Sequence, residues 1–402
     1  MNIRHASLFS QIISLISRHE FAAHVSDLRA ERHSKGFGCW DQFVAMLFCQ
    51  LAQAKSLREI NQSLRSCLGK LRHLGIWEAP KRSKLSYANA HLSYKVYERT
   101  SYDLLTCCQT AAPKKKFRIK NKLLSLDATV IDLCASIFDW AKFKRTKGAI
   151  KLHLLLDHDG YLPSFASISK GNVHEVNIAR TLKFPSGSII ALDLGYYDFT
   201  LFDEWAEQSI WFVSRLKKNA AYYVIKANSV PSRGNIVSDE LIKFAGYESA
   251  KKCPRTLRRI EVWNLENLRA IVLLTNLLQF GATTISRIYR DRWAIESFFK
   301  DLKQNLRVKT FVGTSANALR VQIWTALIAM LLLKYLKFKS RINWSLSNLV
   351  ALIRWNLFTY RGLWAGINNP FETPPQLPQP LQLALNGFNL DSMSGLTVKN
   401  NP

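Results

Sequence analysis

The sequence is poor in acidic residues. It has 29 Asp and Glu against 56 Lys and Arg in 402 residues, which gives a net charge of +27. So large a surplus favours a polyanionic partner, because each Lys or Arg set against a phosphate releases condensed counterions. Nucleic acid is the partner that this charge favours most, and a membrane surface or the ribosome is the alternative.

Three further features are missing. The seven cysteines include no C-x-x-C pair, so they lack the spacing of a zinc site and are expected to be free thiols. The most apolar run, residues 321–333, contains Gln322 and Thr325 and stops at Lys334, so it predicts a buried helix too short to span a bilayer. The first residues also lack the layout of a signal peptide. We therefore expect a cytoplasmic protein without membrane contact.

The first part of the chain is expected to be helical. Apolar spacing predicts three short helices within residues 1–75, and Ser56-Leu57-Arg58-Glu59 has the form of a capping box that opens the third. In a basic chain these helices favour a DNA-binding helix-turn-helix module, and a helical bundle used for dimerisation is an equal alternative. Residues 76–122 are expected to be a basic linker, in which residues 114–116 are three lysines.

From residue 123 the pattern changes to strands. Three expected hairpin strands, at 123–131, 150–156 and 161–168, precede alternating helices and strands. This order predicts an α/β (α+β) fold, a mixed β-sheet flanked by helices, over residues 123–336. A basic, partly β segment at about 217–269 interrupts it as an insertion. Residues 337–402 are expected to form a C-terminal helical segment and a loose tail.

Two acids stand in otherwise apolar strands. Asp127 follows Leu126, and Asp193 lies between Leu192 and Leu194. A carboxylate on an inward strand position is costly unless it is paired or holds a metal. If the two strands are parallel neighbours, the two acids lie side by side.

A third acid, Glu296, belongs to a predicted long helix at 284–306. Tyr289, Arg292, Glu296 and Lys303 fall on one face of that helix. This stripe suits a DNA backbone beside a metal site, with Arg and Lys for phosphates and Glu for the metal. The alternative is a simple Arg292–Glu296 salt bridge on a solvated helix face.

These motifs together resemble the DDE transposases of bacterial insertion sequences, specifically the insertion sequence 4 family. The frame from Tyr289 to Lys303 matches the Y-(2)-R-(3)-E-(6)-K signature of that family at all four positions. Leu126-Asp127-Ala128-Thr129 resembles its first aspartate motif and Asp193-Leu194-Gly195-Tyr196 its second. Leu85-Ser86-Tyr87-Ala88-Asn89-Ala90 is similar to a short motif ahead of the core, and residues 3–64 resemble a small domain of one branch.

The resemblance implies an RNase H-like core with an insertion between the second Asp and the Glu. It implies that Asp127, Asp193 and Glu296 bind two Mg²⁺ or Mn²⁺ ions and are catalytic. Tyr289, Arg292 and Lys303, with Lys300 on the same helix, are the expected DNA contacts. In relatives an insertion Trp stacks on a flipped base, and Trp263 is the one Trp of this segment. A place in the protein core is the alternative for Trp263.

The expected activity is cut-and-paste transposition of an insertion sequence. A strand is cut at the transposon end, and its 3′-hydroxyl then attacks the opposite strand to give a hairpin, and later the target. The expected partners are double-stranded DNA, as terminal inverted repeats and target, and a second chain in a homodimer on the bacterial nucleoid. The alternatives are a non-catalytic DNA-binding protein derived from a transposase, and a nuclease that hydrolyses but does not join.

Overall fold

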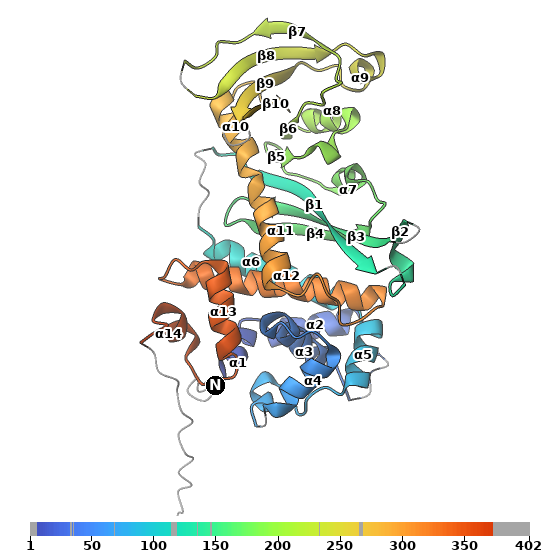
Figure 1. Cartoon of the computed structure of the whole chain (residues 1–402), viewed down its shortest axis with the longest axis vertical. Helices are drawn as coiled ribbons and strands as arrows, with labels where there is room; N and C mark the ends of the chain where they lie inside the picture. Colours follow the sequence, from blue (N-terminus) through green and yellow to red (C-terminus); the bar gives the residue numbers. More distant parts are fainter. Residues whose placement is uncertain are drawn as a thin grey trace, which may run out of the picture.

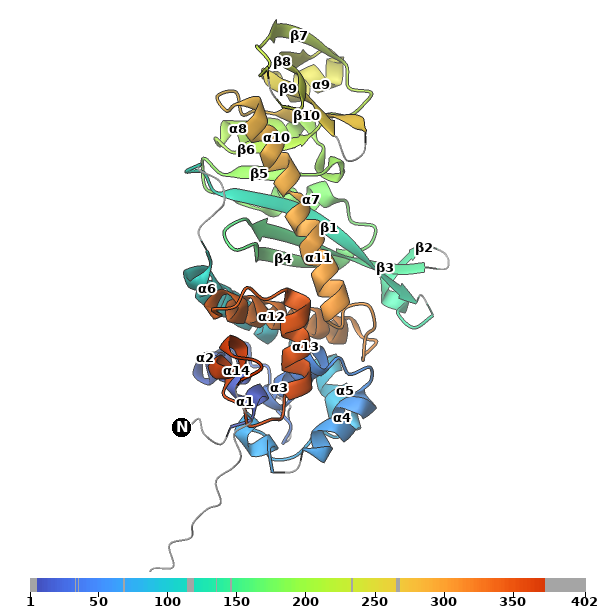
Figure 2. The same cartoon turned by 60° about the vertical axis from the view of Figure 1, so that its left-hand side comes forward.

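The computed structural model describes residues 6–372 except 33, 35, 68, 114–118, 135, 145–146, 233 and 265–267. The lysine run at 114–116 and the predicted tail after residue 372 lie outside the described residues. The molecule is elongated, with a helical body at one end, a large β-sheet in the middle and the strands of the insertion at the other end (Figures 1 and 2).

The helical body is formed by helices that precede the strands in the chain and by helices that follow them. Its helices are α1 (Leu8–Ile13), α2 (Arg18–Asp27), α3 (Cys39–Ala52), α4 (Leu57–Ser66), α5 (Arg82–His91), α6 (Lys95–Ala111), α12 (Ala316–Lys339), α13 (Leu346–Asn356) and α14 (Leu363–Asn368). Half of the expected capping box before α4 is present: Ser56 Oγ accepts from Glu59 N at 3.1 Å, whereas Glu59 accepts at 2.7 Å from the N–H of Lys55, the residue before the N-cap. The expected linker at 76–122 is mostly helical, because Leu85, Val96 and Leu104 bury one face of α5 and α6.

The apolar run at 321–333 is the centre of α12. The expected burial is confirmed, because its side chains are buried from Val321 to Leu333. The expected length was too short, since a polar turn at each end extends the helix to 24 residues. Among the residues that the structure describes, α12 alone has the length and hydropathy of a membrane span, and 83% of that window is buried in the protein.

The sheet has ten strands in the order β2-β3-β1-β5-β6-β10-β9-β8-β7, with β4 paired to β3. The strands are β1 (Leu123–Cys134), β2 (Lys142–Lys144), β3 (Lys147–Asp157), β4 (Leu162–Lys170), β5 (Ile189–Leu192), β6 (Trp211–Arg215), β7 (Tyr222–Ala227), β8 (Ile236–Phe244), β9 (Leu257–Asn264) and β10 (Arg269–Thr275). β1, β3 and β4 are the predicted antiparallel hairpin strands, and β5 pairs in parallel with both β1 and β6. The expected mixed sheet is confirmed.

Helices cover both faces of the sheet, as the order of elements in the sequence predicted. On one face α10 (Ala282–Asp291) and α11 (Trp293–Asn305) run the length of the sheet towards α12 (Figures 1 and 2). α7 (Glu175–Thr181), α8 (Phe199–Glu207) and α9 (Tyr247–Lys252) contribute to the other face. Alternation along the strands divides the core: Leu123 and Ile189 pack against α10, and Leu124 and Ile190 pack against α8.

The insertion continues the main sheet. β7, β8 and β9 are antiparallel neighbours, and β9 pairs with β10, which pairs with β6. The buried ion pair of Arg258 with Asp239 joins β9 to β8. The basic insertion is therefore fixed to the same rigid sheet that carries Asp127.

Candidate active site

Asp127 and Asp193 are brought together by the parallel pair β1 and β5. Leu126 is in register with Leu192, so the next residue on each strand is one of the two acids. Both acids continue the face of Ile189 and Ala191, which packs against α10. We had expected Asp193 to lie within the strand. It lies instead one residue past the end of β5. The predicted side-by-side placement of the strand acids holds.

Glu296 faces these acids from the first turn of α11. The predicted continuous helix at 284–306 is instead two helices that meet at Arg292. Around the junction the backbone hydrogen bonds join residues three apart, from Arg292 N to Tyr289 O and from Ile295 N to Arg292 O. Such bonds make a tighter turn than an α-helix.

Arg292 lies between the acids. Its Nη1 is 3.3 Å from Asp127 Oδ2, and its Nη2 donates to Glu296 Oε1 at 2.8 Å. The predicted Arg292–Glu296 pair thus exists, but the arginine side chain is 3% exposed and is not on a solvated face. Because the guanidinium is enclosed by carboxylates, Arg292 is not an open phosphate contact in this state of the chain.

The electrostatics of the site are unfavourable to Asp127. Burial is the main cause that raises the pKa of Asp127 from 3.8 to about 6, and the neighbouring Asp193 and Glu296 raise it further. The Ala128 N–H and the Arg292 guanidinium act in the opposite direction. Burial, with the two neighbouring acids, therefore outweighs the Arg292 guanidinium and the Ala128 N–H in setting the pKa of Asp127.

The acids fit a divalent cation by their chemistry. Carboxylate oxygens are the ligands that Mg²⁺ and Mn²⁺ prefer, and a cation would offset the burial and the neighbouring charges that raise the pKa of Asp127. Within the described residues no three His, Cys, Asp or Glu side chains are gathered as a metal site. The guanidinium of Arg292 supplies the positive charge between Asp127 and Glu296.

Two other predicted DNA contacts, Tyr289 and Lys303, differ in how far they lie inside the site. Tyr289 is buried, with its ring 5.6 Å from the Arg215 guanidinium and 5.5 Å from that of Arg292. Lys303 donates to Thr129 Oγ1 and to Val130 O at 3.1 Å, next to Asp127 on β1. Tyr289 therefore packs inside the site, whereas Lys303 lies at its edge.

Lys300 and Trp263 lie outside this cluster. Lys300 is exposed on α11. Trp263 is 40% exposed on β9, where it pairs with Ala270 of β10, so the alternative of a core tryptophan does not hold.

Arg215 was missed by the sequence analysis. It ends β6 and lines a hollow of about 490 Å³ beside Leu194, the residue after Asp193. The basic residues of this hollow are Arg215, Lys217, Lys218, Arg259 and Arg269. The run Arg215-x-Lys217-Lys218 was visible in the sequence, but only the sheet order places it next to the acids.

A buried polar network anchors the junction of α10 and α11. His158 lies between Ser125 Oγ, 2.7 Å from its Nε2, and Asp291 Oδ2, 2.7 Å from its Nδ1. Tyr161 also donates to Asp291 Oδ2 at 3.0 Å. Since Asp291 directly precedes Arg292, this network ties the junction to β1 and to the β3–β4 hairpin.

Comparison with known families agrees with this geometry. The family model described as "Transposase DDE domain" matches residues 119–332, and "Domain of unknown function (DUF4372)" matches residues 4–77. The first match spans more than half of the chain, so the chain belongs to the DDE transposases. Within them it is of the insertion sequence 4 type that the motifs indicated. Transposases act on DNA, and DDE domains use divalent metal ions.

Two curated relatives carry the name of a transposase. The chain is 29% identical to "Putative transposase y4zB" of Sinorhizobium fredii, over 75% of this chain and 84% of that protein. It is 28% identical to "Probable transposase for insertion sequence element IS5377" of Geobacillus stearothermophilus, over 66% of this chain and 70% of that protein. The solved "piggyBac transposase synaptic complex with hairpin DNA" is similar at 11% identity and a TM-score of 0.41, over 96% of this chain and 87% of that chain.

Proposed function

We propose that this transposase moves an insertion sequence by cut-and-paste, with Asp127, Asp193 and Glu296 as the catalytic acids. The observation that carries the proposal is the meeting of Asp127 and Asp193 at the end of a parallel strand pair, under a helix that brings Glu296. Two Mg²⁺ or Mn²⁺ ions bound there would activate the attacking oxygen and stabilise the leaving oxygen of a phosphodiester.

The residues around the acids have separate roles in this proposal. Arg292 pairs with Asp127 and Glu296 in the free chain and neutralises part of their charge. On DNA binding its guanidinium turns from the acids to a phosphate, which suits its bidentate geometry. Lys303 binds β1 through Thr129 and contacts the DNA backbone at the edge of the site.

The basic hollow beside Asp193 extends the DNA path onto the insertion. Lys217, Lys218 and Arg269 face a strand that leaves the catalytic acids. Lys300 on α11 and the exposed Trp263 on β9 are the proposed outer contacts, with Trp263 stacking on a base. Tyr289 acts indirectly, because its ring packs between Arg215 and Arg292.

Coordinated cutting of two ends calls for two active sites, so we propose a homodimer that bridges two terminal inverted repeats, on the bacterial nucleoid. A second candidate is a non-catalytic DNA-binding protein derived from a transposase. The intact set of three facing acids favours the enzyme, because a binding module gains nothing from half-buried carboxylates placed close together.

The test is cleavage of a DNA duplex that carries the transposon end, in Mg²⁺. Asp193→Asn is expected to abolish cleavage, because it removes one carboxylate ligand with little change in shape. Asp132→Asn is the matched control, since it makes the same change on β1 at an exposed position of the opposite face from Asp127. Cleavage by Asp193→Asn at the wild-type rate would remove the proposed triad. Joined products besides cut ends distinguish a transposase from a plain nuclease.

A further inference from the structure

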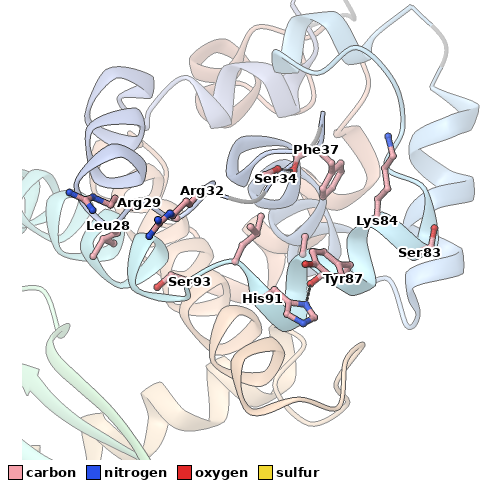
Figure 3. Close-up of a pocket in the computed structure, with 13 residues that line it drawn as sticks. Leu28, Arg29, Arg32, Ser34, Phe37, Ser83, Lys84, Tyr87, His91 and Ser93 are labelled. Atoms are coloured by element: carbon pink, nitrogen blue, oxygen red, sulfur yellow. Dashed lines mark hydrogen bonds between the residues drawn. The ribbon is translucent and has the colours of Figure 1, made fainter.

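A hollow of about 640 Å³ lies in the helical body, between the end of α2 and helix α5. This volume falls in the range of pockets that enclose small ligands, about 300–1,000 Å³. One side comes from the DUF4372 region and the other from the motif that begins at Leu85 (Figure 3). The residues that the argument uses are Arg29, Arg32, Phe37, Lys84, Tyr87 and His91.

The rim of this hollow is basic. Figure 3 shows Arg29 and Arg32 together at one end and Lys84 at the other. No acid occurs among the described residues that line it. Lys84 Nζ is 3.8 Å from Glu78, but both side chains are well exposed, and a pair of this kind contributes little. The rim therefore favours an anion that reaches both ends of the hollow.

The floor of the hollow is aromatic. Tyr87 is 57% exposed and stacks on His91, with ring centroids 4.1 Å apart and an angle of 19° between the planes. His91 Nδ1 lies 2.9 Å from Tyr87 O, so the backbone of α5 holds this pair in place. Phe37 lines the hollow across from Tyr87 (Figure 3). A flat ring inserted there has an aromatic face on which to stack.

We propose that this hollow binds single-stranded DNA, with an unstacked base against Tyr87 and its neighbouring phosphates at Arg29, Arg32 and Lys84. Aromatic stacking between cationic ends is the chemistry by which proteins hold single strands. A duplex keeps its bases stacked inside and offers nothing to the aromatic floor. An acidic peptide would satisfy the rim but not the floor. That the strand is DNA rests on the proposed function. Since Arg29, Arg32 and Phe37 belong to the DUF4372 region, the proposal gives that region a role in binding the strand.

The experiment measures binding of a single-stranded oligonucleotide of about ten nucleotides to the full chain, without divalent metal, by fluorescence anisotropy. Tyr87→Ala is expected to weaken binding roughly 5- to 150-fold, because base stacking contributes about 1–3 kcal/mol. Tyr87→Phe keeps the ring and is expected to bind within about twofold of wild type. Arg32→Ala is expected to lower the salt dependence of binding by about 0.7 in the log–log slope.

Trp355→Ala is the matched control, because Trp355 is 81% exposed on α13 and lies outside the hollow. Equal affinities of Tyr87→Ala and Trp355→Ala would overturn the site. If a deoxynucleotide monophosphate bound as tightly as the oligonucleotide, and Tyr87→Ala lost both, the proposal of a single-stranded ligand would be overturned. The ligand of the hollow would then be a free nucleotide. Asp193→Asn reports on cleavage alone, so the failure of the proposed function and the failure of this site give different results.

Discussion

At the scale of single residues, the acids of the site act against stability. Asp127 is held in a place where burial and two neighbouring carboxylates disfavour its charged form. When a carboxyl group has a higher pKa in the folded than in the unfolded chain, the free energy of unfolding of the protein falls as the pH rises from the unfolded to the folded pKa. For Asp127 this window runs from about 4 to about 6.

Asp127→Asn is therefore expected to stabilise the metal-free chain above pH 6, by at most roughly 3 kcal/mol, and to have little effect at pH 4. Thermal unfolding at both pH values measures this, with Asp132→Asn as the control. Added Mg²⁺ is expected to raise the Tm of the wild type and not of Asp127→Asn, because a ligand of the folded state stabilises it. A stabilisation that is the same at pH 4 and pH 7.5 would contradict this account.

At the scale of elements, the junction of α10 and α11 sets the direction of Arg292 and Glu296. The two helices lie on one face of the sheet and meet at a tight turn that His158 and Tyr161 hold through Asp291. His158 is buried, with a side chain only 1% exposed. Removing the carboxylate leaves buried donors without their acceptor, which costs about 1–3 kcal/mol.

Asp291→Ala is expected to lower the free energy of unfolding by about 1–3 kcal/mol. It is also expected to lower kcat for DNA cleavage by a larger factor than it changes KM. The reason is that the variant retains the DNA-binding surface but loosens Glu296 and Arg292. Denaturant unfolding and cleavage kinetics measure the two effects. Ser297→Ala, an exposed neighbour on α11, is the control. Loss of stability with unchanged kcat would limit Asp291 to a structural role.

At the scale of the whole molecule, the helical body and the sheet share one core. Phe43 and Met46 of α3, Leu327 of α12, Phe298 of α11 and Leu154 of β3 belong to the same buried cluster. The domain boundaries that we expected at residues 75 and 336 pass through this core. α12 belongs with the N-terminal helices, although it follows the catalytic strands in sequence.

We therefore expect the helical body and the sheet to unfold in one transition. Calorimetry measures the transition, and hydrogen exchange in α3 and β1 tests whether both regions open together. A chain that begins after residue 77 is expected to aggregate, because it exposes the apolar surface of α12. Two separate transitions, or a soluble folded truncation, would show that the N-terminal helices are an independent domain.

The sequence by itself determined the class of protein and indicated the three acids that we propose as catalytic. The isolated acids in apolar strands and the frame from Tyr289 to Lys303 are local patterns, and both survive in the structure. We expected Asp127 and Asp193 to lie side by side if their strands were parallel neighbours, and the parallel register of β1 and β5 meets that condition.

Only the tertiary structure decided how far the site extends. The turn at Arg292, the placing of Arg215 next to Asp193 and the network from Ser125 to Asp291 depend on contacts between residues far apart in the chain. The insertion strands joined the main sheet, and α12 joined the N-terminal helices, because each buries an apolar face that a distant segment completes. Local sequence patterns record that such a face exists, and the fold determines what covers it.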